Sequence, residues 1–215
     1  MTKIFVLSIA VLLIAGMGCV SSSITVLEKK EPARLYEKIL VIYVDEGCEF
    51  TIFDSTTYNI CLRSCFLNGG NMELRRRVEG EIASNLVSKG STVLKSSDML
   101  DTRTNTYADF NRLIDRHAIE VLLLVDFHRF SHTESQAQPT GNYQNGLYIP
   151  NTPMHYKALG AAYGCYLIDA KTSALPFWKA EIGLKGKIGA GKNGLNRGMA
   201  RQLGETLKSS GYIAR

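Results

Sequence analysis

The stretch Lys38-Ile39-Leu40-Val41-Ile42-Tyr43-Val44 decides the fold, because it is a continuous apolar and largely β-branched run. Runs of this kind are typical of strands that are buried on both faces. A second such run extends from Ile119 to Val125. Together they predict strands at the centre of a sheet whose two faces are covered by other elements.

Helical patterns separate these runs. After Asn71, a good N-cap residue, apolar side chains recur every four residues until Gly90: Leu74, Val78, Ile82 and Leu86. Thr92–Leu94 predicts a short strand, and a second helix follows with an inner face made of Phe110, Leu113, Ile114 and His117. The order strand, helix, strand, helix, strand predicts parallel strands joined by right-handed crossovers.

The pattern changes in the second half of the chain. Segments 157–169 and 175–187 alternate between apolar and polar residues and predict a long antiparallel hairpin. Leu195, Met199, Leu203 and Leu207 then mark one face of a final helix. The predicted fold class is α/β (or α+β): a mixed sheet with an N-terminal β-α-β-α-β parallel part, the hairpin and a C-terminal helix.

The N-terminus predicts export. A single lysine, Lys3, precedes an apolar run from Ile4 to Ile14 that is too short for a membrane span, and small residues lead to Cys19. Gly18-Cys19 resembles the lipobox of bacterial lipoproteins, although Gly16 stands where leucine is more usual. The resemblance implies that residues 1–18 are a cleaved signal peptide and that Cys19 carries a diacylglycerol and a further chain such as palmitate. Ordinary secretory cleavage, with Cys19 incidental, is the alternative.

The rest of the chain divides into a tether and one domain. Residues 19–35 are polar without an apolar period and predict a lipid-attached tether. Residues 36–215 predict a single domain with a cysteine-bearing insertion at 46–70 and a long loop at 132–156. Four cysteines besides Cys19 are disulfide candidates in an exported protein, with the pairing left open: Cys48, Cys61, Cys65 and Cys165.

Charge and glycine patterns argue against nucleic-acid and nucleotide partners. The formal charge is +5, and the basic residues are scattered except at Arg75-Arg76-Arg77, which predicts a solvated helix face. Gly186–Asn193 imitates a phosphate-binding loop, but Asn193 replaces the required Ser or Thr and the segment precedes the last helix. We therefore expect no cofactor.

Catalytic patterns are weak. His128 and His132 share a face if the third strand continues, which makes them candidate metal ligands, but four clear ligands are not placed. Cys61-x-x-x-Cys65 lacks the spacing of redox-active pairs, so a structural disulfide is favoured. We expect a protein that is not an enzyme, with a metal- or thiol-dependent envelope enzyme as the alternative.

The strand and hairpin residues resemble bacterial envelope lipoproteins related to the TolB amino-terminal domain and to the curli-secretion lipoprotein CsgG. The matching stretches are Lys38–Val41, Gly90, Ile119–Leu123, Tyr166–Thr172 and Phe177–Ala180, and Ser173 replaces the usual glycine. The resemblance implies a structural, assembly or binding component. An oligomeric secretion component like CsgG is a further alternative.

These patterns together predict a lipid-anchored protein of the bacterial cell envelope, with outer-membrane residence facing the periplasm favoured because Val20 is not the aspartate of the inner-membrane retention signal. It would bind an envelope protein partner. Aromatic and apolar residues in loops are costly unless they meet a partner or fold back, so we expect a binding surface at Tyr143, Tyr148 and Ile149, together with the hairpin face that bears Tyr163. Trp178 is expected in the core.

Overall fold

The computed structural model describes residues 20–31, 35–45, 47–63, 71–87, 91–100, 106–136, 141–144, 147–150, 155–171, 174–187 and 191–213. Only the backbone is described for 132–136, 141–144, 147–150, 155–157 and 187. Within these ranges, no helix has the length and apolar character needed to cross a membrane.

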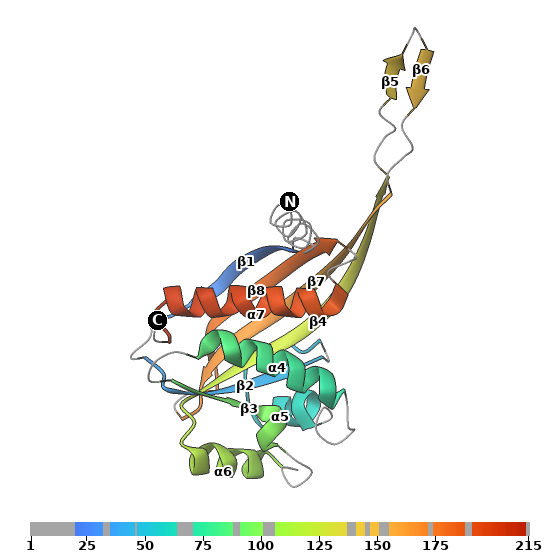
Figure 1. The fold of residues 1–215 in the computed structure, drawn as a ribbon. Helices are drawn as coiled ribbons and strands as arrows, with labels where there is room; N and C mark the ends of the chain where they lie inside the picture. The colour runs from blue at the N-terminus through green and yellow to red at the C-terminus, as the bar shows by residue number, and fades with distance from the viewer. Residues whose placement is uncertain are drawn as a thin grey trace, which may run out of the picture.

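A six-stranded mixed sheet forms the centre of the molecule, in the order β1-β8-β7-β4-β2-β3 (Figure 1). The strand β2 is parallel to β3 and β4, and the pairs β4–β7, β7–β8 and β8–β1 are antiparallel. The predicted fold class is therefore confirmed. The strands are β1 (Val20–Lys29), β2 (Lys38–Val44), β3 (Thr92–Lys95), β4 (Val121–Gln136), β7 (His155–Asp169) and β8 (Pro176–Lys187).

The sheet is packed on both faces because alternate residues of its central strands enter different cores. Ile39, Val41 and Tyr43 join a first core with α4 (Met72–Leu86) and α7 (Gly191–Ser209). Leu40, Ile42 and Val44 join a second core with α6 (Tyr107–His117) and η1 (Tyr58–Leu62). The elements of this second layer are α2 (Ser55–Thr57), η1 (Tyr58–Leu62), α5 (Ser96–Met99) and α6 (Tyr107–His117).

The predicted tether is wrong for residues 20–29, which form the edge strand β1. This strand pairs with β8 along its whole length, from Val20 opposite Gly186 to Lys29 opposite Trp178. Its residues look like a linker because the strand lies at the sheet edge, where most of its side chains are exposed. The face of β1 that is turned toward α7 also carries a polar residue, Ser22. Its hydroxyl donates to Gln202 Oε1 of α7 at 2.8 Å.

The predicted long loop at 132–156 is also wrong in part. The strand β4 continues to Gln136 and pairs there with His155 of β7, and beyond this point β5 (Gly141–Gln144) pairs with β6 (Leu147–Pro150). The outer ends of β4 and β7, together with β5 and β6, extend away from the body as an arm (Figure 1). Hydrogen bonding between neighbouring strands, rather than an apolar pattern, sustains this extension.

One part of the sheet is covered on a single face. The helix α7 packs on β1, β7 and β8 through Leu195, Met199 and Leu203. On the opposite face, small and polar residues such as Ser21, Ser23 and Lys185 are exposed, and no helix among the described residues lies over them. This open face positions the candidate site described below.

Two helical glycines predict opposite effects of the same substitution. A Cβ at Gly204 of α7 would lie 2.8 Å from the Asn85 carbonyl oxygen of α4, whereas a Cβ at Gly80 of α4 would meet nothing within 4 Å. We expect Gly204→Ala to lower the free energy of unfolding by about 1–3 kcal/mol, because the two helices must separate. Gly80→Ala should raise it by about 0.5–1 kcal/mol, because alanine favours a helix.

Urea unfolding followed by Trp178 fluorescence and by circular dichroism measures both values. If Gly204→Ala stabilised the protein as Gly80→Ala does, the close approach of α4 and α7 would be contradicted.

Candidate functional site

The residues of the predicted binding surface lie on the three strands β5, β6 and β7. Tyr163 was expected at the surface, and this prediction is wrong: the side chain is fully buried in the first core and its hydroxyl donates to Asn196 Oδ1 of α7 at 2.5 Å. Trp178 is also fully buried, as expected. Tyr143, Tyr148 and Ile149 lie on β5 and β6, with Tyr143 paired to Tyr148, and their side chains lie outside the described part.

Of the cysteines that the structure describes, two form a disulfide and one is a buried free thiol. Cys48 and Cys61 form a disulfide that links the segment after β2 to η1. Cys165 was a disulfide candidate, and the structure corrects this: the thiol is free and lies in the first core, where burial raises its pKa far above the ordinary value. A thiol of this kind is a poor nucleophile. Cys19 and Cys65 lie outside the described residues.

The two histidines that were candidate metal ligands do not keep the predicted alternation. A bulge between Phe127 and Arg129 shifts the register, so that His128 is the extra residue and His132 is paired with Leu159. Along a regular strand, residues an even number of positions apart lie on the same face. The extra residue interrupts this alternation, so His128 and His132 do not share a face. Among the side chains that the structure describes, no three His, Cys, Asp or Glu residues form a group that could hold a metal.

His128 instead faces the carboxylate of Asp126. Its Nε2 lies 3.3 Å from Asp126 Oδ2, and Asp126 is fully buried near the end of the parallel part of β4. Gly164 makes room for this pair, because a Cβ there would lie 2.7 Å from His128 Nε2. Burial, with a smaller contribution from the Asp126 charge, raises the pKa of Tyr166 to about 12. The hydroxyl of Tyr166 is therefore protonated at neutral pH and unsuited to act as a base.

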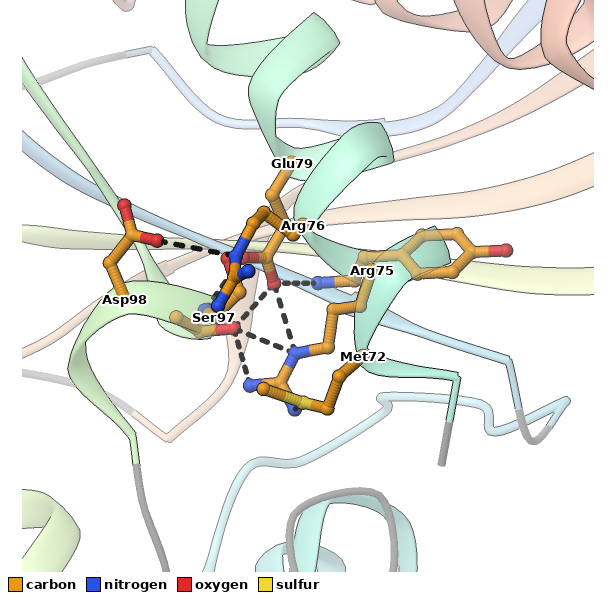
Figure 2. Close-up of polar contacts among 8 residues, drawn as sticks. Met72, Arg75, Arg76, Glu79, Ser97 and Asp98 are labelled. Carbon is orange, nitrogen blue, oxygen red and sulfur yellow. Dashed lines mark hydrogen bonds and ion pairs between the residues drawn. The ribbon is translucent and has the colours of Figure 1, made fainter. Parts of the chain in front are cut away.

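A second buried carboxylate, Glu79 of α4, is fixed by hydrogen bonds from three elements (Figure 2). Its Oε1 accepts from the backbone N–H of Tyr43 at 3.0 Å and from Arg75 Nε at 3.3 Å, and also from the Ser96 hydroxyl. Its Oε2 accepts from the Ser97 backbone N–H at 2.8 Å. Because both oxygens are already bonded within the protein, we assign Glu79 a role in holding α4 against β2 and α5.

The predicted solvated face at Arg75-Arg76-Arg77 is therefore only partly correct. Arg75 is buried and pairs with Glu79, whereas Arg76 and Arg77 are exposed and face Asp98 and Glu73. The signal that could have revealed the buried pair is the four-residue spacing of Arg75 and Glu79. Both residues adjoin the apolar stripe of α4, each one position after one of its members.

The open face of the sheet contains a hollow of about 580 Å³, which we call the serine hollow. It is lined by residues of four strands, including Ser21, Ser23, Arg129, Ser131, Gly183 and Lys185. Arg129 and Lys185 are exposed, and none of the described residues that line this hollow is a carboxylate, although Glu181 lines an adjoining hollow together with Arg129. Its volume falls within the range of about 300–1,000 Å³ that is typical of small-molecule sites. Sequence reasoning missed it, because its residues are far apart in the chain.

The segment that imitates a phosphate-binding loop lies between β8 and α7. Residues 188–190 lie outside the described part, and α7 begins at Gly191. Lys192, the residue that would meet a phosphate, instead places its Nζ 4.6 Å from the centre of the Phe130 ring. The strand before the segment is antiparallel to its sheet neighbours, unlike the strand that precedes a nucleotide-binding loop.

Comparison with known proteins assigns no family. No protein-family model and no curated protein matches the chain. Among solved structures, the chain is similar to PelC dodecamers from Paraburkholderia phytofirmans. A single-residue variant of PelC aligns at 13% identity over 93% of this chain and 100% of that chain, with a TM-score of 0.43. A second PelC structure aligns at 13% identity over 91% and 100%, with a TM-score of 0.41.

The lipoprotein GNA1162 from Neisseria meningitidis is also similar, at 14% identity over 80% of this chain and 96% of that chain, with a TM-score of 0.38. At these identities and TM-scores, the similarities do not identify the role of the chain or its membership of the TolB- or CsgG-related group.

Proposed function

We propose that this chain is a lipid-anchored protein of the bacterial cell envelope, attached through Cys19, which works by binding a partner rather than by catalysis. One observation carries the proposal. The strand β1 begins at Val20, the residue after Cys19, and is hydrogen-bonded to β8 from that residue onward. Acyl chains on Cys19 would therefore hold the sheet itself at the membrane surface, without a flexible linker.

The anchored end of the sheet is also the end from which the arm extends. Val20 lies opposite Gly186, Gly186 lies opposite Leu159, and Leu159 lies opposite His132, so these four residues form one row across the sheet. Beyond this row β8 continues by one residue, Lys187, which lies opposite Ala158, whereas β4 and β7 continue up to the pair of Gln136 and His155. In the proposed function, the arm reaches a partner at the membrane, in the inner leaflet region of the outer membrane.

Loss of the anchor is tested with Cys19→Ala in the producing bacterium. We expect the wild-type chain to incorporate labelled palmitate and to float with membranes in a density gradient, because buried acyl CH₂ groups contribute about 0.8 kcal/mol each. The variant should incorporate no palmitate and should lose membrane attachment after cleavage or remain as uncleaved precursor. Equal palmitate incorporation in the two proteins would contradict the anchor.

Partner binding needs a separate test in which the anchor is intact. The triple variant Tyr143→Ala, Tyr148→Ala, Ile149→Ala changes the tip of the arm, and the matched control Tyr107→Ala changes a tyrosine on α6 in the second layer. After mild cross-linking in the envelope, we expect the wild type and the control to capture the same protein and the triple variant to lose it. Capture by the triple variant at the wild-type level would reject the arm as the binding surface.

A further inference from the structure

The serine hollow brings cationic side chains and hydroxyl groups together, and no carboxylate is among its described lining residues. Arg129 of β4 and Lys185 of β8 both line it, and neither side chain forms an ion pair within the described part of the chain. Ser131 adds a hydroxyl group to the same walls, as do Ser21 and Ser23, whose hydroxyl groups donate to the backbone carbonyl oxygens of Lys185 and Gly183 at 3.2 and 3.3 Å. Guanidinium, ammonium and hydroxyl groups are the side chains that bind phosphate oxygens in proteins.

Small residues of β7 and β8 leave open space above the sheet in the hollow and directly beside it. A Cβ at Gly160 would lie 2.3 Å from Ser131 Oγ, and a Cβ at Gly183 would lie 3.0 Å from Ser23 Oγ. Gly160 is paired with Ser131 on one side and with Lys185 on the other, and Ala162, two residues along β7, is paired with Arg129 and with Gly183. Larger side chains at these positions would fill the space between Arg129 and Lys185.

The hollow lies beside the start of β1. Ser21 is paired with Lys185, and Ser23 is paired with Gly183, so the first strand residues after Cys19 form one wall of the hollow. On the other side of the sheet, Val20 lies against Gly198 of α7, near the exposed Arg201, whereas the neighbouring Arg197 is paired with Glu81 at 3.5 Å. A membrane that holds Cys19 would bring lipid headgroups to this end of the sheet.

We propose that the serine hollow binds the phosphate of an anionic phospholipid headgroup, with Arg129 and Lys185 as the charged ligands. This inference rests on the proposed lipid anchor, because the anchor is what presents the hollow to a membrane. Binding orients the open face of the sheet toward the membrane surface and thereby fixes the direction of the arm.

The experiment uses the full-length lipidated chain in a neutral detergent and measures how fast a water-soluble amine reagent labels Lys185, by mass spectrometry. Lys171, an exposed residue at the opposite end of the β7–β8 hairpin, is the internal reference. We expect phosphatidylglycerol added to the micelles to slow the labelling of Lys185 several-fold relative to Lys171. Phosphatidylcholine, whose phosphate is neutralised within the headgroup, should leave the ratio unchanged.

Substitutions at Arg129 test whether the serine hollow causes the slower labelling of Lys185. Arg129→Gln should abolish most of the protection, Arg129→Lys should retain it, and the matched control Arg112→Gln on α6 should behave as the wild type. Equal protection by both lipids, or full protection in Arg129→Gln, would overturn the proposal. Protection by inorganic phosphate alone at the same concentration would reject the lipid headgroup in favour of free phosphate.

The absence of the lipid anchor and the absence of the headgroup site would give different results. The micelle measurement requires no attachment through Cys19, whereas flotation and palmitate labelling of Cys19→Ala test the attachment alone. A protected Lys185 in a chain that carries no palmitate would therefore reject the anchor and keep the headgroup site.

Discussion

Replacing Glu79 by alanine is expected to lower the free energy of unfolding by about 3–5 kcal/mol, because the substitution breaks a buried ion pair on one side only. Arg75 is 4% exposed and would keep its charge in the core without the carboxylate that it faces. The backbone N–H groups of Tyr43 and Ser97 would lose their acceptor as well. Urea unfolding followed by circular dichroism measures the loss.

The same helix offers a matched control. Arg77 Nη2 lies 2.6 Å from Glu73 Oε1 with the same four-residue spacing, but the side chains are 46% and 84% exposed. Exposed pairs of this kind contribute less than about 1 kcal/mol. Glu73→Ala should therefore change the stability little, and a loss as large as that of Glu79→Ala would show that the removal of a negative charge, rather than burial, causes the effect.

A double substitution distinguishes the ion pair from packing. If the uncompensated charge of Arg75 causes most of the loss, Arg75→Leu combined with Glu79→Leu should cost less than the sum of the two single changes. Simple additivity would contradict the coupling between these side chains.

The sequence predicts the parts of this fold whose stability depends on apolar burial. Leu40 and Leu123 belong to continuous apolar runs, and both are fully buried in the centre of the sheet. The hairpin of β7 and β8 was predictable because its inner and outer residues alternate. The edge strand β1 was not, because only one of its edges is paired and most of its side chains are exposed, which leaves a composition like that of a linker.

The candidate site was less predictable than the fold, for two physical reasons. Residues 21–23, 129–131 and 183–185 meet only through strand pairing, and none of these segments resembles a binding motif alone. A single bulge at His128 reverses the alternation along β4, so the face assigned to later residues was wrong. Tyr163 was misplaced because an aromatic residue in an amphipathic strand is equally compatible with core and surface until α7 is in place.

The disulfide gives the second large expected effect on stability. Cys48 and Cys61 are separated by 13 residues in the sequence, and the chain between them supplies Phe50, Phe53 and Tyr58 to the second core. Closing a loop of this length contributes about 3 kcal/mol, chiefly by restricting the unfolded chain. The double variant Cys48→Ser, Cys61→Ser should lose about this amount.

The stability of the wild type should depend on redox conditions in the same measure. A reducing agent should lower the urea midpoint of the wild type to that of the double variant and should leave the double variant unchanged, since Cys165 already carries a free, buried thiol. A further fall of the double variant under reduction would show that another cysteine pair also stabilises the protein. Agreement between reduced wild type and double variant would instead mean that the second core reaches full stability only in an oxidising compartment, which is the environment that export provides.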